Sequence, residues 1–469
     1  MNEKSRKLLT NVGILTISNF ASKILVFLLV PLYTSILTTV EFGIYDLIIS
    51  TISLLVPILS LNIIDAVMRF LMDKDYPKSK VATIGIKYIS CSIVIVVLLL
   101  VLINQLDIWQ QINGLEIYIF FYYFFYVLNQ YFIQLAKGLE QVAAMGITGV
   151  LGTLIMITTN VVFLIVFKWG LPGFFLANIL SQAIPVLYLF FKTHFWVFLD
   201  LGKTDKYLTK NMLVYSTPLI ASVIGWWVNS GSDKYIVTFF CGVAVNGVLS
   251  VAYKIPSILN TMQGIFIQAW QISAIQEYGE TETAKFYGNT FEIINVIMCA
   301  ACSWLILLTK PLAHMLYAKQ FYAAWKFVPF LLISSVLNCV SGILGPILAA
   351  KKDSKAMAKS AVYGASVNLI LNILFVYFIG AQGVTVATVI ASYVIYQIRK
   401  VAVGKDIIIE NYRYVIITWI LLCIQASTEI YTDFWYVEIL LMIVMFFLNY
   451  SNIRKIFYVL IKRKRREMR

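Results

Sequence analysis

Histidine and charge are both scarce in this 469-residue chain. Charged residues make up 13% of the sequence, whereas soluble domains average about 25%. The two histidines, His194 and His314, flank different apolar segments and are expected near opposite membrane faces. This separation excludes a His-based zinc or catalytic cluster, and the low charge content excludes an ordinary water-soluble domain.

Cysteine is present but forms no recognisable site. Cys299 and Cys302 have the spacing of a redox or zinc pair, but no second pair accompanies them. All six cysteines lie in or at the ends of apolar segments, where thiols behave as small hydrophobic groups. They are Cys91, Cys241, Cys299, Cys302, Cys339 and Cys423. We therefore expect no metal site and no cofactor.

Long apolar runs dominate the sequence. Hydrophobic residues make up 60% of the chain, and the mean hydropathy is +0.84. About fourteen runs of about 20 residues recur, each long enough to cross roughly 30 Å of hydrocarbon as a helix. Barrel strands would show shorter, alternating segments. The sequence predicts an all-α polytopic membrane protein with about fourteen transmembrane helices.

The net charge of +14 comes mainly from one predicted side of the membrane. With a cytoplasmic N-terminus, most of the 37 basic residues fall on cytoplasmic segments, as the positive-inside rule describes. These segments are residues 4–7, 69–87, 137, 192–210, 285, 351–359, 399–413 and 454 onward. The basic surplus therefore indicates topology, with both termini cytoplasmic, and not a nucleic-acid partner. The basic tail is expected to contact anionic membrane lipids.

Two short patterns occur twice. Residues 170–177 (Gly-Leu-Pro-Gly-Phe-Phe-Leu-Ala) return as residues 380–387 (Gly-Ala-Gln-Gly-Val-Thr-Val-Ala) with the same spacing. A second pattern around Gly43 resembles one around Gly247 at nearly the same offset. Glycine alone is common at turns between helices, but two matches at one offset indicate an internal duplication.

The duplication predicts the domain organisation. The offset contains an even number of predicted spans, so both copies enter the membrane in the same direction, as parallel repeats. We expect an N-terminal lobe of about six helices at 1–195 and a C-terminal lobe of about six at 196–410. Residues 411–469 would add two helices and the basic tail. In parallel repeats the working site is expected between the lobes.

Charged residues inside the predicted spans are the main functional candidates. Asp233 and Lys234 lie in one apolar stretch, Lys254 in the next, and Lys23 near the middle of the first. A charge at membrane depth costs roughly 3 kcal/mol, so it usually faces a partner or a watery cavity. We expect Asp233 to pair with Lys254. Lys23 and Lys234 would then give a central cavity a positive charge suited to an anionic substrate.

Structural and coupling roles stand beside this hypothesis. The charges can lock helices together, and the lysines can extend to the membrane interface. An unpaired, desolvated Asp233 would instead be able to exchange a proton and couple transport. Asp65 and Arg69, one helical turn apart, are expected to form an i,i+4 ion pair, with an inner gate as a further reading.

Several motifs, taken in order, resemble those of bacterial polysaccharide flippases. These are the Wzx-like branch of the MATE-related multidrug/oligosaccharidyl-lipid/polysaccharide exporters. Each motif is loose, but together they extend over most of the chain. They are residues 27–33 (FLLVPLY), 41–45 (EFGIY), 232–236 (SDKYI), 247–255, 266–270 (FIQAW), 321–325 (FYAAW) and 368–383.

The resemblance implies a bacterial inner-membrane transporter. Its substrate would be an undecaprenyl-diphosphate-linked oligosaccharide for capsule, O-antigen or exopolysaccharide, moved to the outer leaflet by alternating access. Cations in a central cavity would hold the diphosphate or acidic sugars, which assigns Lys23, Lys234 and Lys254 as substrate-binding residues. A polysaccharide polymerase and glycosyltransferases are the implied protein partners.

Two other transport functions stay open, and an enzymatic function is disfavoured. An ion-coupled multidrug antiporter or a lipid II flippase would share the fold. Drug exporters commonly carry an acid in the first span, but residues 12–37 contain none. Lipid II flippases carry several arginines in early spans, where this chain has only lysine. A membrane glycosyltransferase would need carboxylates in a sizeable loop, and the outer loop 310–326 has none, so we expect no enzyme.

Overall fold

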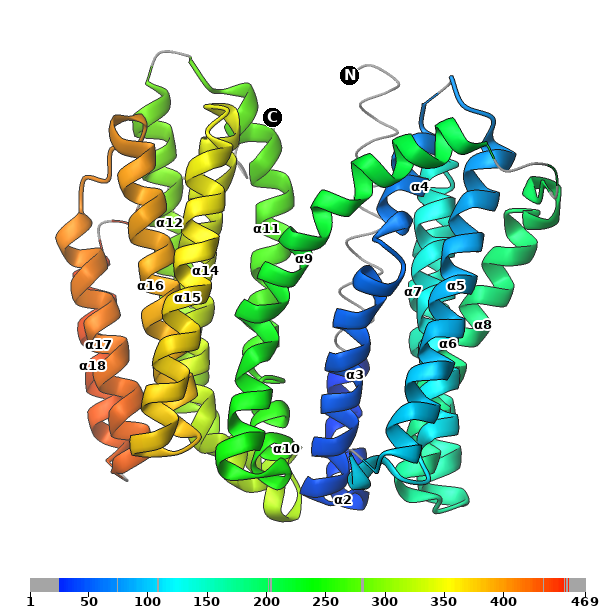
Figure 1. Ribbon diagram of the computed structural model, residues 1–469. Helices are drawn as coiled ribbons and strands as arrows, with labels where there is room; N and C mark the ends of the chain where they lie inside the picture. Colours follow the sequence, from blue (N-terminus) through cyan, green and yellow to red (C-terminus); the bar gives the residue numbers. More distant parts are fainter. Residues whose placement is uncertain are drawn as a thin grey trace, which may run out of the picture. The chain divides into compact units, whose positions relative to one another are not determined.

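The part of the chain that the structure describes is helical and contains no strand (Figure 1). The computed structural model describes residues 25–73, 75–107, 109–200, 202, 205–279, 282–432, 434–450, 452 and 454. Among these residues, nine helices are long and apolar enough to cross a membrane, and three shorter apolar helices accompany them. The predicted all-α polytopic fold class is therefore confirmed, and the chain is a multi-pass membrane protein.

Contacts divide the chain into two compact units, residues 1–227 and 228–469. The division falls inside α9 (Lys206–Cys241), a continuous helix. The lobe boundary expected from the sequence, at residue 195, lies earlier, in the connection between α8 and α9.

The first part of α9 packs with the first unit, which explains where the division falls. The Ser216 hydroxyl donates a hydrogen bond to the carbonyl of Leu61 at 2.8 Å, and the Trp227 indole donates to the carbonyl of Ser50 at 3.0 Å. These side chains stand on the part of α9 that belongs to the first unit, at or before residue 227.

The first unit contains a series of helices joined by short turns. Its α3 begins with a capping box: the Thr38 side chain accepts from the amide of Glu41, whose carboxylate accepts from the amide of Thr38. The elements are α2 (Val30–Ile36), α3 (Thr39–Leu59), α4 (Ile63–Leu71), α5 (Lys78–Gln105), η1 (Gln110–Ile112), α6 (Glu116–Gly138), α7 (Val142–Asn160), the π-helical η2 (Val161–Val166), α8 (Gly170–Lys192) and η3 (Phe195–Phe198).

Helices α4, α5 and α6 of this unit pack closely against one another. A Cβ at Gly85 would lie 2.5 Å from Val67 and 2.8 Å from Tyr131, so only glycine fits there. The buried Tyr131 hydroxyl donates to the carbonyl of Ala82 at 2.7 Å, which satisfies its polar group inside the core.

The second unit is built around α14 (Val328–Ala350), the most extensively buried of its spans. It packs against α11, α12, α16 and α17, while α15 packs mainly on α16. The other elements are α10 (Val243–Ala252), α11 (Pro256–Gln276), α12 (Thr283–Leu307), α13 (Thr309–Leu316), η4 (Lys319–Phe327), α15 (Ser354–Ile379), α16 (Gln382–Val403), η5 (Gly404–Asp406), α17 (Tyr412–Tyr431) and α18 (Trp435–Leu448).

The two last helices are integrated into the second unit by buried polar contacts. The Trp419 indole of α17 donates to Asn295 Oδ1 of α12 at 2.9 Å. About two turns further along α12, the Ser303 hydroxyl donates to Gln425 Oε1 at 2.8 Å, and the Gln425 amide donates back to the Ser303 carbonyl at 3.1 Å. Residues after 411, expected as an addition outside the repeat, are thus anchored to it.

The duplicated glycine pattern has the same structural use in each unit. Gly170 and Gly380 have positive φ angles of 56° and 64°, which favour glycine, where one helix ends and the next begins. Gly173 and Gly383 then sit against the preceding helical segment. A Cβ would lie 2.9 Å from Trp169 Cβ in the first case and 2.4 Å from the Phe375 backbone in the second.

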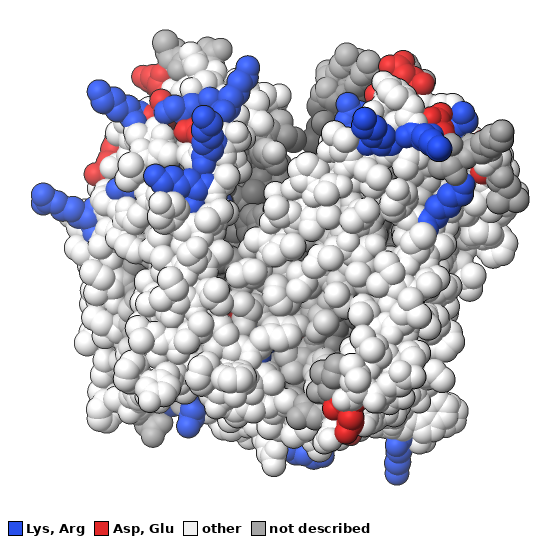
Figure 2. All heavy atoms as spheres, in the orientation of Figure 1, with Lys and Arg blue, Asp and Glu red and all other residues white. Residues whose placement is uncertain are grey.

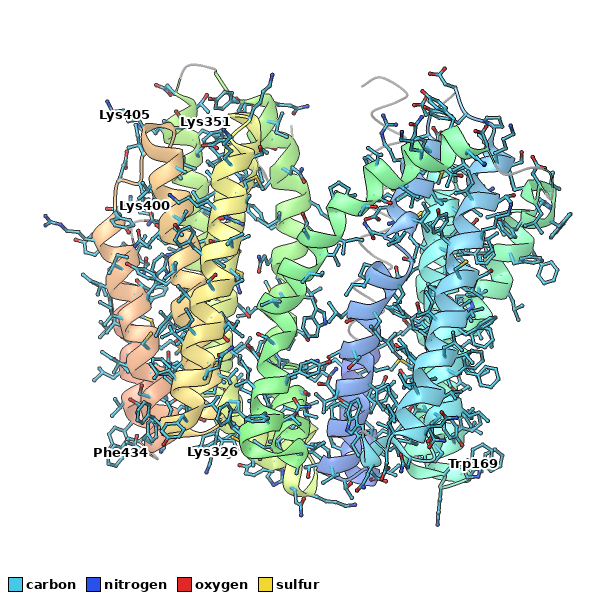
Figure 3. The ribbon with its side chains drawn as sticks, in the orientation of Figure 1. Trp169, Lys326, Lys351, Lys400, Lys405 and Phe434 are labelled. Atoms are coloured by element: carbon cyan, nitrogen blue, oxygen red, sulfur yellow. The ribbon has the colours of Figure 1, made fainter. Side chains whose placement is uncertain are left out.

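Charged side chains gather at the ends of the helices. On the face shown in Figure 2, the surface between the two ends is almost free of lysine, arginine, aspartate and glutamate. In the second unit, Lys351, Lys400 and Lys405 lie at one end, whereas Lys326 and Phe434 lie at the other (Figure 3). The sequence likewise predicted Lys326 on the opposite side of the membrane from Lys351, Lys400 and Lys405.

Candidate functional site

Asp233 is buried at the centre of a polar cluster in the second unit. Its side chain, on α9, is 2% exposed. Tyr253 Oη donates to Asp233 Oδ2 at 2.9 Å, and Asn372 Nδ2 donates to Asp233 Oδ1 at 2.6 Å. The Thr388 hydroxyl lies 3.4 Å from Oδ2. Neutral donors on three other elements therefore surround this carboxylate.

Each donor reaches Asp233 from a different local structure. Tyr253 occupies the turn that separates α10 from α11, where Pro256 at the start of α11 lacks the amide hydrogen that would continue a helix. Asn368 and Asn372 are four residues apart on α15 and share a face, so that Asn372 Nδ2 also donates to Asn368 Oδ1 at 2.9 Å. Thr388 extends from α16, and its single hydroxyl hydrogen is shared between Asp233 and the carbonyl of Val384 in its own helix, which lies 2.8 Å away.

The cluster is rich in oxygen and contains an acceptor that is not satisfied. Asn372 Oδ1 is buried and has no hydrogen-bond partner among the described residues. Carboxylate, amide and hydroxyl oxygens are the ligands that hard cations prefer. No group of three or more His, Cys, Asp or Glu side chains that could hold a metal occurs in the described ranges. The arrangement suits one proton or one small monovalent cation better than a transition metal.

The expected partner of Asp233 differs from the observed one. The ion pairs recorded for the described residues are Lys80–Asp205, Lys285–Glu410 and Lys351–Asp406, and none involves Asp233. The adjacent phenol of Tyr253 takes the position that the sequence analysis gave to Lys254. The carboxylate thus receives a neutral phenol donor where an ammonium group was expected.

The structure describes two of the three predicted substrate-binding lysines. Lys234 follows Asp233 on α9 and is half-buried, and Lys254 is half-buried in the α10–α11 turn. Both belong to the second unit, one residue away from Asp233 and from Tyr253 respectively. Lys23 lies outside the described residues.

Asp65 and Arg69 lie on α4 but are not brought together. Asn62 Nδ2 donates to Asp65 Oδ2 at 2.9 Å, and Gln134 Nε2 of α6 donates to Asp65 Oδ1 at 3.4 Å. Arg69 is exposed. The ion pair expected from their spacing is absent from the ion pairs of the described chain. Amide donors satisfy both carboxylate oxygens while the guanidinium faces outward, so this pair is corrected to an α4–α6 contact.

Four residues of the cluster were not chosen from the sequence: Tyr253, Asn368, Asn372 and Thr388. The asparagines carried a usable signal, because two amides four residues apart in an otherwise apolar span are costly unless they face protein. Tyr253 and Thr388 carried none, since both residue types are common in membrane helices.

Comparison with known proteins identifies the family and the fold. Residues 8–271 match the family described as polysaccharide biosynthesis protein, which is more than half of the chain. No curated protein matches the sequence.

Solved structures show the same architecture at low sequence identity. A structure of the lipid II flippase MurJ in an inward closed conformation has a TM-score of 0.72 and 14% identity, over 95% of this chain and 99% of that one. An inward-facing multidrug resistance MATE family transporter of the MOP superfamily has a TM-score of 0.59 and 16% identity, over 89% of this chain and 96% of that one. A MOP superfamily transporter from Pyrococcus furiosus has a TM-score of 0.54 and 14% identity, over 89% of this chain and 93% of that one.

Proposed function

Because the chain belongs to the polysaccharide biosynthesis protein family, we propose that it is a flippase for a polyprenyl-diphosphate-linked oligosaccharide. It would act in the bacterial inner membrane, with both termini cytoplasmic. The observation that carries the proposal is the match to this family in a chain that has the fold of solved lipid and drug transporters. The repeat unit would be destined for capsule, O-antigen or exopolysaccharide, after which a polymerase and glycosyltransferases would be its neighbours in the pathway.

Substrate binding is assigned to cations at membrane depth. Lys234 and Lys254 supply positive charge in the second unit, and Lys23 is the corresponding candidate in the first span of the sequence. A diphosphate carries concentrated negative charge, which ammonium groups in a partly desolvated site bind through charge-assisted hydrogen bonds. Alternating access would then carry the bound headgroup from one leaflet to the other.

Energy coupling is assigned to the Asp233 cluster. A carboxylate held by Tyr253, Asn372 and Thr388 can accept a proton or a monovalent cation, and either would neutralise its buried charge. Transport into vesicles with the proton and sodium gradients collapsed separately would identify the ion. Indifference to both gradients would remove the coupling role and leave Asp233 as a packing residue.

Deletion of the gene tests the function directly. We expect loss of a surface polysaccharide and accumulation of the lipid-linked repeat unit on the cytoplasmic side. Replacing Lys234 or Lys254 with Ala should reproduce this phenotype in part, with export reduced roughly tenfold or more. Lys355→Ala is the matched control, since Lys355 is exposed at the start of α15. Normal export in the deletion strain would refute the proposal.

A lipid II flippase is the second candidate, because the similarity to MurJ extends over nearly the whole of both chains. Both substrates are polyprenyl diphosphates and differ in the attached sugars. Rescue of a strain depleted of its lipid II flippase would favour this alternative. Rescue of a strain lacking a polysaccharide flippase would favour the first.

A further inference from the structure

Arg399 occupies a position between three helices of the second unit. It stands on α16, four residues before that helix ends at Val403. Its Nε donates to Ser360 Oγ of α15 at 3.0 Å, and its Nη1 donates to the Ser341 carbonyl of α14 at 3.0 Å. The next residue, Lys400, lies at the end of the unit that also bears Lys351 and Lys405 (Figure 3).

No carboxylate compensates the Arg399 charge among the described residues. The acids near this end have other partners: Asp406 pairs with Lys351 at 3.0 Å and Glu410 with Lys285 at 3.9 Å. Glu292 accepts from the backbone amide of Asn411 at 2.8 Å. A half-buried guanidinium without an acid is unusual in a membrane protein, where such charges usually pair or mark a ligand path.

The two recorded hydrogen bonds leave part of the guanidinium available. Arginine has five N–H donors, and the contacts to Ser360 and Ser341 use two of them. Ser341, which supplies the carbonyl, also has a buried hydroxyl with no hydrogen-bond partner in the described chain. The guanidinium also lies against Gly345, where an added Cβ would be in ordinary van der Waals contact with Nη1 at 3.7 Å.

This combination fits an oxyanion. The planar fork of N–H donors matches the oxygens of a phosphate group, which arginine binds in a bidentate manner, and the unused hydroxyl of Ser341 is a further donor on a residue that Arg399 contacts. Arg399 lies about 6 Å from the end of α16 at a rise of 1.5 Å per residue, nearer to that end than to the middle of the helix, and its long side chain can extend further toward the membrane interface.

We infer that Arg399 and Ser341 bind the phosphate group of a lipid at the cytoplasmic end of the second unit. On the proposed function, this lipid is the polyprenyl diphosphate of the substrate before it is moved, and Arg399 is its first contact. An anionic phospholipid offers the same phosphate chemistry at the same depth. The alternative role is a brace, in which the two hydrogen bonds merely connect α14 and α15 to α16.

Binding of defined lipids to the purified full chain tests this site. Undecaprenyl diphosphate and phosphatidylglycerol would be titrated separately, in detergent, and bound lipid measured by native mass spectrometry. We expect Arg399→Gln to weaken binding roughly tenfold or more. Arg413→Gln, an exposed arginine at the start of α17, is the matched control and should bind as the unsubstituted chain does.

Ser341→Ala distinguishes phosphate binding from a purely structural role of Arg399. Arg399 bonds the backbone carbonyl at position 341, so this variant keeps both recorded hydrogen bonds and should fold normally. Weaker binding of undecaprenyl diphosphate alone supports a substrate site, and weaker binding of both lipids supports a general phosphate-lipid site. Unchanged binding of both lipids in Arg399→Gln and Ser341→Ala overturns the inference. Because this assay requires no export, it can fail while the flippase proposal stands, and the reverse also holds.

Discussion

Asn372 Nδ2 lies 2.6 Å from Asp233 Oδ1 and joins α15 to the buried carboxylate of α9. The same amide also donates to Asn368, so both of its hydrogens are used, while its own oxygen lacks a partner among the described residues. The Asn372 contact is the shortest of the three to this carboxylate, at 2.6 Å against 2.9 Å for Tyr253 and 3.4 Å for Thr388. It is also the reason to treat the cluster as a site and not as a single buried acid.

Asp233→Asn is expected to abolish coupling while preserving the shape of the side chain. A neutral amide cannot bind a proton or neutralise a cation, so the energy gradient would lose its effect on transport. Typical coupling free energies correspond to roughly 5- to 150-fold changes, and export should fall within that range. Lipid-linked sugar on each side of the membrane would be measured, with the amount of inserted protein as control. Full export from this variant would contradict a coupling role.

Tyr253→Phe should weaken the cluster less than Asp233→Asn. The substitution removes one donor to the carboxylate and keeps the ring. Hydrogen bonds between membrane helices contribute about 0.6 kcal/mol on average and up to about 1.7, so the melting temperature of the purified chain should fall modestly. Tyr377→Phe, at an exposed position on α15, is a comparison of equal size. An equal loss for both variants would indicate that the phenol of Tyr253 does not stabilise the cluster.

Gly383→Ala should destabilise the second unit more than most glycine substitutions. The new Cβ would meet the Phe375 backbone at 2.4 Å, and backbone cannot move aside cheaply. Overpacking of this kind costs about 1–3 kcal/mol. Gly264→Ala is the matched control, because nothing lies within 4 Å of its added Cβ. Thermal unfolding in detergent would give the difference; equal melting temperatures would refute the close contact.

Much of this arrangement was predictable because it follows from hydropathy and glycine. The all-α membrane fold follows from apolar runs of membrane length, and the paired glycines at 170 and 380 mark turns that need positive φ. Asp233 was identifiable because a buried charge is costly wherever it occurs in an apolar span.

Partners were not predictable in the same way. The choice between Tyr253 and Lys254 depends on the direction that each side chain takes where α10 gives way to α11, which spacing does not determine. Asp65 has the spacing for Arg69, but an amide from α6 competes for it, and that competitor is distant in the sequence. Arg399 was read as a topological charge because its neighbours on α14 and α15 become visible only in three dimensions.

The Lys80–Asp205 ion pair predicts that the stability of the fold decreases at acidic pH. It joins the start of α5 to the residue before α9 at 3.3 Å. The backbone amide of Leu208 is the main cause that lowers the pKa of Asp205 below its ordinary value, and Lys80 adds to it. A lowered folded-state pKa contributes stability above the ordinary pKa of 3.8, and this contribution is lost as pH falls through the folded value.

Unfolding of the unsubstituted chain and of Asp205→Asn, compared from pH 7 downward, would show this dependence. The two curves should differ at neutral pH and approach each other toward acid. A constant difference across the whole range would mean that the carboxylate charge contributes nothing at this contact.

The position of Tyr253 between two helices has a consequence for movement along the membrane normal. Donors to Asp233 come from α15, α16 and the α10–α11 turn. These hydrogen bonds form together only when α9 has one particular axial position relative to the other three elements. A shift of α9 by a single residue along its axis would move the carboxylate by about 1.5 Å. Such a shift would exceed the tolerance of a hydrogen bond of ordinary length. The protonation or occupancy of Asp233 and the axial register of α9 are therefore thermodynamically linked, and a probe of either one reports on the other.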